Sequence, residues 1–353
     1  MHPDTLRKAG AGVRMVAEAG MLSTPEADDN SEYRKEYVAK KQFYDQRREY
    51  NTLLTREARE EHLMATLRDA AIHIGNFYPL LPKGTVSEYD RDNEAVLVLT
   101  DWHYGMVTNN IWNHYDTSIC RQRLADLRAK VVDRLQLHKV GMLHVFVLGD
   151  MANGAIHVTS RVAAEETVVE QLMHVSEMLA QFISYVSDYV PYTQVYCTYG
   201  NHMRTVQNSK DSIHADNMEK IIPWWLKERL AGFDNVRVVD SGKDEMIRAV
   251  VCGCEVCGIH GDLDGGKDAQ LLVSQMYDRA FGRKMRYLFY GHLHSPYLVE
   301  NSGVTMIRSA SLCGTDEFAK NLRLFAEPSQ TMAIFSCGEL DALYNLTVGV
   351  NGA

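Results

Sequence analysis

Apolar residues form three short uninterrupted runs in the middle of the chain, at positions 95–100, 144–148 and 194–199. An unbroken apolar run of this length is typical of a strand that is covered on both faces. The two segments between these runs, at about 117–139 and 163–189, are longer and have helical character. Strand–helix–strand order predicts parallel pairing with right-handed crossovers, so we expect an α/β domain.

Shorter apolar segments with a more β-like composition follow later in the chain. We expect strands at 246–251, 255–259, 287–290, 305–309 and 331–335. Because these strands come after the strand–helix–strand region, they predict a second sheet that packs against the first.

The first 90 residues are more polar and are expected to be helical. Positions 31–62 carry eight basic and seven acidic side chains and contain no proline or glycine, which favours a long solvated helix with i,i+4 ion pairs. Several aromatic residues give this helix a partly apolar stripe. The stripe either packs on the main domain or forms an arm for a second copy of the chain or for nucleic acid. We therefore predict a helical N-terminal extension over 1–90 and a catalytic domain over 91–353. The aromatic residues are Tyr33, Tyr37, Phe43, Tyr44 and Tyr50.

Composition narrows the classes of protein to which this chain can belong. The formal net charge is −9, which argues against a uniformly basic surface but leaves room for a local basic groove. No run of about 18 apolar residues predicts a membrane span, and the first residues lack the pattern of a secretory signal. Seven cysteines, an odd number, fit reduced thiols. We expect a cytoplasmic protein that does not engage a membrane.

Polar residues gather where five of the predicted strands end. In an open α/β sheet the carboxyl edge of the strands is where ligands bind. Glycine stands beside four of the five groups, and it lets the chain turn sharply close to a bound group. The five groups are Asp101-Trp102-His103, Gly149-Asp150, Gly200-Asn201-His202, His260-Gly261-Asp262 and Gly291-His292-Leu293-His294.

The residue types and their spacing indicate a metal site. Asp101 and His103 are two positions apart, as are His292 and His294, so each pair could face one side of an extended strand end. Carboxylate, amide and imidazole donors without thiolates suit Mn²⁺, Fe or Zn²⁺ better than a structural zinc.

As an ordered set over about residues 95–310, the motifs D-x-H, G-D, G-N-H, H-G-D and G-H-x-H resemble the calcineurin-like metallophosphoesterase superfamily. In layout the chain is most similar to the branch that includes DNA-repair exonucleases and phage-type members. The resemblance implies an α/β fold in which two mixed β-sheets pack in a sandwich flanked by helices. It also implies two divalent metal ions, with Mn²⁺ expected and Fe or Zn²⁺ as alternatives.

Carried over by position, the resemblance assigns a role to each motif residue. Asp150 would bridge the two ions, and His202 would protonate the leaving group or stabilise the transition state. Asp101, His103 and His294 would hold the first ion, and Asn201, His260 and His292 the second.

The chain departs from the superfamily pattern at two motifs. Many members continue G-D with an acidic residue and then Arg-Gly, whereas this chain has Met151-Ala152-Asn153-Gly154, which argues against a Ser/Thr protein phosphatase. Many members also follow G-N-H with an acid, and Met203 stands there instead, which puts the protonation state of His202 in question.

Candidate substrate-binding residues lie near the motifs. Arg204 either contacts a substrate phosphate or forms a surface salt bridge. His157 and Arg161 lie after the bridging aspartate, in a loop that either faces the substrate or simply leads into a helix. A basic stretch before the last motif either follows a nucleic-acid backbone or forms a solvated helix face. It comprises Lys267, Arg279, Arg283, Lys284 and Arg286.

Cys252, Cys254 and Cys257 form a C-x-C-x-x-C motif. No fourth ligand for a zinc knuckle is evident nearby, and Gly253 and Gly258 favour a tight hairpin over a structural metal.

The sequence thus favours a dinuclear-metal phosphodiesterase acting on nucleic acid, a nuclease. A small-molecule phosphatase or cyclic-nucleotide phosphodiesterase is the alternative within enzymes. A metal-stabilised scaffold that binds a partner, or a second copy of the chain, through the N-terminal helices is the alternative outside them.

Overall fold

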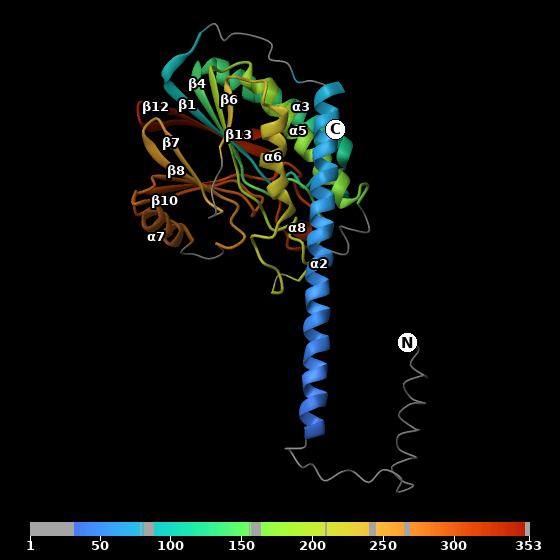
Figure 1. Cartoon of the computed structure of the whole chain (residues 1–353). Helices are drawn as coiled ribbons and strands as arrows, with labels where there is room; N and C mark the ends of the chain where they lie inside the picture. Colours follow the sequence, from blue (N-terminus) through green and yellow to red (C-terminus); the bar gives the residue numbers. More distant parts are fainter. Residues whose placement is uncertain are drawn as a thin grey trace. The chain divides into compact units, whose positions relative to one another are not determined.

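The protein is described by a computed structural model for residues 32–77, 80, 88–154, 156, 164–208, 210–239, 245–264 and 269–349. The chain divides into two compact units, Met1–Ala65 and Thr66–Ala353. Figure 1 shows the elements of each unit, coloured along the sequence.

The predicted N-terminal helix is present as α2 (Glu32–Phe77), whose first part belongs to the first unit. An i,i+4 pair of the expected kind joins Glu36 and Lys40 at 2.7 Å. The aromatic side chains described in the first unit are exposed, with Tyr37 61% and Phe43 59% accessible. Pairing of this helix with a second copy therefore remains a prediction. Beyond Thr66 the helix belongs to the second unit, where Leu67 and Ala71 are buried.

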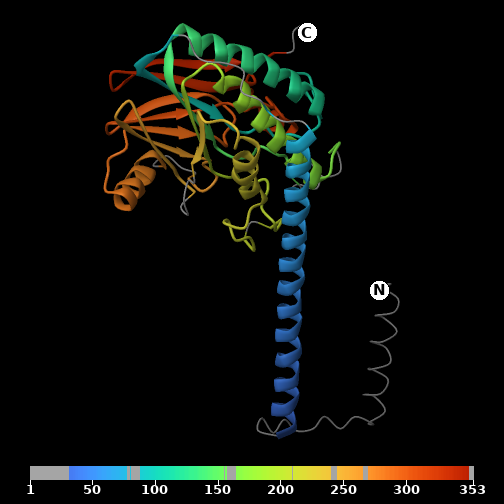
Figure 2. The ribbon, with the colours of Figure 1, turned by 45° about the horizontal axis from the view of Figure 1, so that its top comes forward.

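The first sheet of the second unit has the order β13-β12-β1-β4-β5-β6. Four of its strands are parallel: β1 (Asp90–Leu99), β4 (Val140–Val147), β5 (Tyr192–Cys197) and β6 (Val236–Val239). Helices α3 (Thr117–Leu137), α5 (Val168–Ser187) and α6 (Ile221–Arg229), the last preceded by the 3₁₀ turn η1 (Met218–Lys220), connect them. Figures 1 and 2 show these three helices on one side of the sheet.

One predicted strand belongs to a different sheet from the one expected. The segment 331–335 lies in β12 (Ser329–Ser336), which pairs antiparallel with β1 and with β13 (Glu339–Thr347), not with the second sheet. The segment is apolar because it is buried on both faces, and that property does not indicate which sheet a strand will join.

The second sheet has the order β10-β11-β9-β8-β7. Helix α7 (Ala269–Phe281) connects β8 and β9, which are parallel. Two short strands, β2 (Thr108–Asn109) and β3 (His114–Tyr115), and the short helix α8 (Glu317–Asn321) lie outside both large sheets. The strands of the second sheet are β7 (Ile247–Val251), β8 (Cys254–Ile259), β9 (Tyr287–Tyr290), β10 (Tyr297–Asn301) and β11 (Val304–Arg308).

A core between the two sheets holds the second unit together. Phe146 and Phe335 from the first sheet meet Tyr287 and Phe289 from the second, with ring centroids 5.0–5.7 Å apart. A second apolar cluster, which includes Tyr277, lies beneath α7. The predicted architecture, two mixed β-sheets packed in a sandwich and flanked by helices, is therefore confirmed (Figure 2).

The cysteine motif forms a hairpin. Val251 pairs with Cys254 across a two-residue turn in which Cys252 and Gly253 both have positive φ. Cys254 belongs to the core between the sheets and Cys257 to the cluster beneath α7. Among the described residues, none of the groups suited to hold a metal includes a cysteine of this motif.

Within the described ranges, no helix combines the length and the apolar character that crossing a bilayer would need.

Candidate metal centre

The five motifs converge at the edge where their strands end. Asp101 and His103 follow β1, Asp150 follows β4 and Asn201 follows β5, all parallel neighbours in the first sheet. From the second sheet, His260 follows β8, and His292 and His294 follow β9. Side-chain donor atoms from the two sheets lie as close as 3.1 Å to each other. The structure thus brings together all seven residues predicted as metal ligands.

The first group of donors surrounds a buried carboxylate oxygen. His103 Nε2 and His294 Nε2 face each other at 3.1 Å and lie 3.7 and 3.4 Å from Asp101 Oδ1. The other oxygen, Asp101 Oδ2, accepts hydrogen bonds from the Thr100 hydroxyl and from the backbone N–H of His292. One carboxylate oxygen is therefore fixed by the protein, while the other faces two imidazole nitrogens.

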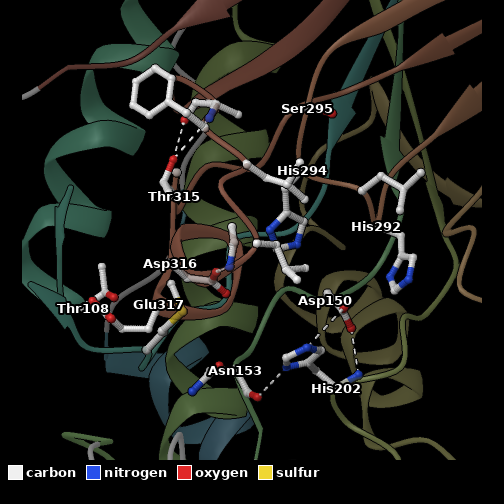
Figure 3. A pocket seen from close by; sticks show the side chains of 18 of the residues that line it. Thr108, Asp150, Asn153, His202, His292, His294, Ser295, Thr315, Asp316 and Glu317 are labelled. Atoms are coloured by element: carbon white, nitrogen blue, oxygen red, sulfur yellow. Dashed lines mark hydrogen bonds and ion pairs between the residues drawn. The ribbon is translucent and has the colours of Figure 1, made fainter. Parts of the chain in front are cut away.

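The second group repeats this arrangement around Asp150. His260 Nε2 lies 3.1 Å from Asp150 Oδ2 and 3.4 Å from Asn201 Oδ1. One donor atom from each of Asp150, His260 and His292 lies within 4.8 Å of the other two. Asp150 also forms such a group with His103, so it stands between the two sets, as the bridging role requires. Figure 3 shows Asp150, His202, His292 and His294 facing a common space.

The donor set fits divalent cations. Asp101 Oδ1 and Asp150 Oδ2 are buried oxygens that accept no hydrogen bond. Such oxygens are costly unless something else satisfies them. The ring of His260 is turned toward the centre because its Nδ1 is 2.8 Å from the carbonyl oxygen of Leu148, the arrangement usual for a metal-binding imidazole. Cations at this position would satisfy both carboxylate oxygens at once.

The charges within the cluster depend on each other. Burial by itself would raise the pKa of Asp101, but His294 and His103 beside it lower that pKa well below its usual range. Burial would likewise raise the pKa of Asp150, but His260 and His202 outweigh it and lower that pKa strongly. The pKa of His292 is lowered by burial and by His260. Both carboxylates are therefore held ionised, as metal ligands must be.

The ligands converge through an unusual backbone. Five of the seven predicted ligands have positive φ: Asp101 (52°), His103 (46°), Asp150 (51°), His292 (63°) and His294 (57°). Few residues other than glycine adopt this conformation, and it costs free energy. We expected strand alternation to turn the two residues of each pair, Asp101/His103 and His292/His294, to one side. The residues of each pair do lie together, but not for that reason, because their positive φ values are not those of a β-strand.

Two glycines make room for Asp150. A Cβ at Gly149 would lie 2.2 Å from the backbone nitrogen of Gly200, and a Cβ at Gly200 would lie 2.2 Å from Asp150 Oδ1. The ends of β4 and β5 approach this closely only because both positions lack side chains.

His202 is oriented by a backbone carbonyl. Its Nδ1 lies 2.9 Å from the Asn153 carbonyl oxygen, and its backbone N–H donates to Asp150 Oδ1 at 2.8 Å (Figure 3). The carbonyl oxygen accepts a hydrogen bond from Nδ1–H, so Nε2, 3.9 Å from Asp150 Oδ2, is directed toward the donor cluster. The Asn153 carbonyl therefore orients the His202 ring without help from an acidic side chain at position 203. Met203, which occupies that position, is buried.

Glu219 is a residue of the site that the sequence did not indicate. Its buried carboxylate accepts from the backbone N–H groups of Asp150 (3.1 Å), Met151 (2.6 Å) and Gly200 (2.9 Å). A longer contact of 3.4 Å reaches the N–H of Ala152. Burial and the charge of Asp150 raise the pKa of Glu219, and the backbone N–H groups oppose them. One carboxylate thus joins the loop after β4 to the loop after β5.

Cys313 is a second such residue. Its buried Sγ lies within 4.8 Å of donor atoms of His103 and His294. Nothing in the sequence around position 313 resembles a metal motif, so only the fold shows that this thiol borders the first group.

Of the three predicted substrate-binding residues, the structure describes Arg204. The Arg204 guanidinium donates to the carbonyl oxygens of Val206, Gln207 and Asn201 in its own loop. A role for Arg204 in substrate binding stays a prediction, as do the roles of His157 and Arg161, which lie outside the described residues. Arg279, Arg283, Lys284 and Arg286 precede β9, whereas the metal motif follows its other end, so this part of the basic stretch lies at the opposite end of that strand. Lys267 lies outside the described residues.

Asp262 of the H-G-D motif binds a histidine of the preceding loop. His214 Nε2 lies 2.9 Å from Asp262 Oδ2, and its Nδ1 lies 2.8 Å from Glu245 Oε2. The hydrogen bond to Asp262 and the one to Glu245 raise the pKa of His214 to about 9, against the opposing effect of burial. The loop that carries Asn201 and His202 is thereby attached to the loop that carries His260.

This ion pair predicts a loss of stability at alkaline pH. The folded-state pKa of His214 is about 9 and its ordinary value is 6.5, so the stabilisation is complete below pH 6.5 and is lost as the pH rises through about 9. His214→Gln should lower the free energy of unfolding at pH 6.5 by about 1 kcal/mol, or about 2–4 °C in Tm, because solvent screens a partly exposed pair. Thermal melts of the variant and the wild type between pH 6 and 10 should converge at the alkaline end. A pH-independent difference would contradict the assignment.

Comparison with known proteins finds distant relatives. No family model matches the chain. The chain is 22% identical over 298 residues to the SPbeta prophage-derived uncharacterized protein YonJ of Bacillus subtilis (strain 168), an alignment that covers 80% of this chain and 71% of that protein.

Several solved structures are also similar. An archaeal phosphodiesterase is 13% identical, covering 71% of this chain and 99% of its own, with a TM-score of 0.36. Zinc-bound Vps29 from Entamoeba histolytica is 13% identical, covering 73% and 94%, with a TM-score of 0.35. A predicted phosphoesterase from Streptococcus pneumoniae TIGR4 is 12% identical, covering 74% and 96%, with a TM-score of 0.33. At these identities and TM-scores, the side chains of this chain itself must support any functional inference.

Proposed function

We propose that this protein is a dinuclear-metal-dependent phosphoesterase of the calcineurin-like type that hydrolyses phosphodiester bonds, with nucleic acid as its substrate. The observation that supports the proposal is the convergence of seven oxygen and nitrogen donors from five strand ends around two buried carboxylate oxygens without hydrogen-bond donors. The ordered motifs that suggested the superfamily are the same residues that meet in space. The prophage origin of the relative YonJ supports placement with the phage-type branch.

The chemistry divides between cations and side chains. Two divalent ions held by these residues, which we propose to be Mn²⁺, would attract phosphate oxygens, activate a water and stabilise the leaving oxygen. Asp150 would hold both ions at a fixed separation, because it contributes to both donor groups. His202, protonated on both ring nitrogens, would deliver the proton of Nε2 to the leaving oxygen and keep the proton of Nδ1, which is hydrogen-bonded to the Asn153 carbonyl oxygen.

A small-molecule phosphoesterase is a second candidate, favoured by one observation. The described residues that line the cavity beside the donors include no lysine or arginine. A nucleic-acid groove ordinarily contains such side chains to pair with successive phosphates.

The test is turnover of a chromogenic phosphodiester by metal-stripped protein that is then supplied with Mn²⁺, Zn²⁺ or Fe²⁺. We expect hydrolysis with Mn²⁺ and none after chelation. Absence of turnover of both a diester and a monoester with each of these cations would overturn the proposal. Binding of DNA that weakens steeply with salt would favour the nuclease, because counterions are released when phosphates are paired. Turnover without such binding would favour the small-molecule enzyme.

A further inference from the structure

A cavity of about 840 Å³ opens beside the donor cluster. Asp150, His202, His292 and His294 form part of its lining, so a phosphate held by the proposed ions would lie against this part of the cavity (Figure 3). The volume is within the range of sites that enclose a small organic molecule. The cavity is therefore in position to receive a group that is esterified to the scissile phosphate.

The far wall of the cavity is apolar and exposed. It belongs to residues 315–326, called here the 315–326 loop, which contains α8. Leu322, Leu324 and Phe325 line the cavity and are 54%, 59% and 53% exposed. Exposed apolar side chains grouped beside a catalytic centre are typical of a binding surface.

Local hydrogen bonds hold this wall in shape. The Thr315 hydroxyl accepts from the N–H of Ala326 at 3.1 Å and lies 3.3 Å from its carbonyl oxygen, which closes the loop at its base. Asp316 caps α8 by accepting from the N–H of Ala319 at 2.7 Å. The N–H of Leu324 donates to the Ala319 carbonyl oxygen at 2.9 Å. The apolar side chains are thus presented by a loop with its own hydrogen bonds, and the ring of Phe325 packs edge-on against Trp112.

The charges of the lining exclude some occupants. Outside the donor cluster, the charged residues described in the lining are Asp316 and Glu317, both acidic. Further phosphates of a polyanionic chain would be repelled here, so the occupant carries no additional negative charge. Thr108 and Ser295 add hydroxyl groups to the lining, with which a purely aliphatic chain could not pair. The Ser295 Oγ accepts from Arg308 and can still donate its proton, whereas the Thr315 hydroxyl is already engaged by Ala326. A planar apolar group that also carries hydrogen-bond donors satisfies both conditions.

We propose that this cavity binds the nucleoside of the substrate, with a single unstacked base against Leu324 and Phe325 and its phosphate over the donor cluster. The proposal rests on the phosphoesterase function above and names its substrate as a nucleotide ester. A base within a duplex cannot enter such a cavity without leaving the stack. The substrate is therefore a nucleotide or the end of a single strand.

The experiment compares two diesters that share one leaving group, thymidine 5′-(4-nitrophenyl phosphate) and methyl 4-nitrophenyl phosphate, with Mn²⁺. We expect kcat/KM to be at least about tenfold higher for the nucleoside ester, because stacking of one base supplies that much. The double variant Leu324→Ala/Phe325→Ala should reduce this ratio toward one. The matched control Tyr297→Ala/Leu298→Ala removes an equally exposed pair outside the cavity lining and should keep the ratio.

The outcomes separate the two proposals. Hydrolysis of both esters at similar kcat/KM by the wild type would overturn the nucleoside proposal and leave the phosphoesterase function standing. A preference that survives the double variant, with an unchanged circular dichroism spectrum, would also overturn it. Hydrolysis of neither ester with any of the cations would overturn the phosphoesterase function, and the nucleoside proposal with it.

Discussion

Replacing Asp150 with asparagine should reduce kcat/KM for a phosphodiester by at least about 10³-fold, equivalent to about 4 kcal/mol of transition-state stabilisation. The substitution keeps the shape of the side chain and removes its charge. Oδ2, which faces His260 Nε2 at 3.1 Å, would be an amide group with no capacity to bridge two cations. The number of Mn²⁺ ions bound per chain, measured by calorimetry or elemental analysis, should fall in parallel.

Asp116→Asn is the matched control for this variant. Asp116 caps α3 by accepting from the N–H of Ile119, and asparagine caps helices about as well. The control should retain both turnover and metal content. Wild-type turnover by Asp150→Asn would show that this aspartate does not bridge catalytic ions, whatever the fold.

The convergence of the seven candidate ligands could be predicted because it depends on their order along the chain and on one rule of topology. Buried parallel strands are recognisable as apolar runs, and their carboxyl ends meet at one edge. Once β1, β4 and β5 were predicted, the polar residues after them had to lie together. The same rule applied to the parallel strands β8 and β9. The placement of β12 was predicted wrongly, because this strand lies in the first sheet and not in the second.

The rest of the site depends on contacts that carry no local signal. A carbonyl oxygen is present at every residue, so nothing in the sequence indicates that the one of Asn153 orients His202. The positive φ values of Asp101 and Asp150 arise from the close approach of loops, since neither residue is glycine. The 315–326 loop contains exposed leucines and a phenylalanine that resemble ordinary core residues until the fold leaves them beside the cavity.

Glu219 is the clearest case of a residue that only the fold reveals, because it lies on a 3₁₀ turn 19 residues from Gly200 and 69 residues from Asp150. Oε1 accepts from Met151, and Oε2 accepts from Asp150 and Gly200. Its two oxygens thus engage the loop that supplies Asp150 and the loop that supplies Asn201. The charge is buried and is stabilised by these N–H groups.

Glu219→Gln should therefore weaken both stability and metal binding. Glutamine has one acceptor oxygen, so in either rotamer its NH₂ group would face backbone N–H groups that need an acceptor. Each buried donor left without a partner costs about 1–3 kcal/mol, and we expect a total loss of about 2–4 kcal/mol in the free energy of unfolding. At a temperature where the variant is still folded, Mn²⁺ affinity should fall about 10- to 100-fold, as for other residues that position metal ligands.

Two measurements distinguish this positioning role from a general loss of stability. Glu228→Gln changes the same residue type at an exposed position of α6 and should leave both the denaturation midpoint and the Mn²⁺ affinity unchanged. Glu219→Asp keeps the charge on a shorter side chain, so it should recover part of the stability while still displacing one of the two loops. If Glu219→Gln lost stability but bound Mn²⁺ with wild-type affinity in calorimetry, the loops would hold the ligands in place without Glu219. Its carboxylate would then serve the fold alone, because a group that positions Asp150 cannot be altered without moving the donor that we propose to bridge both ions.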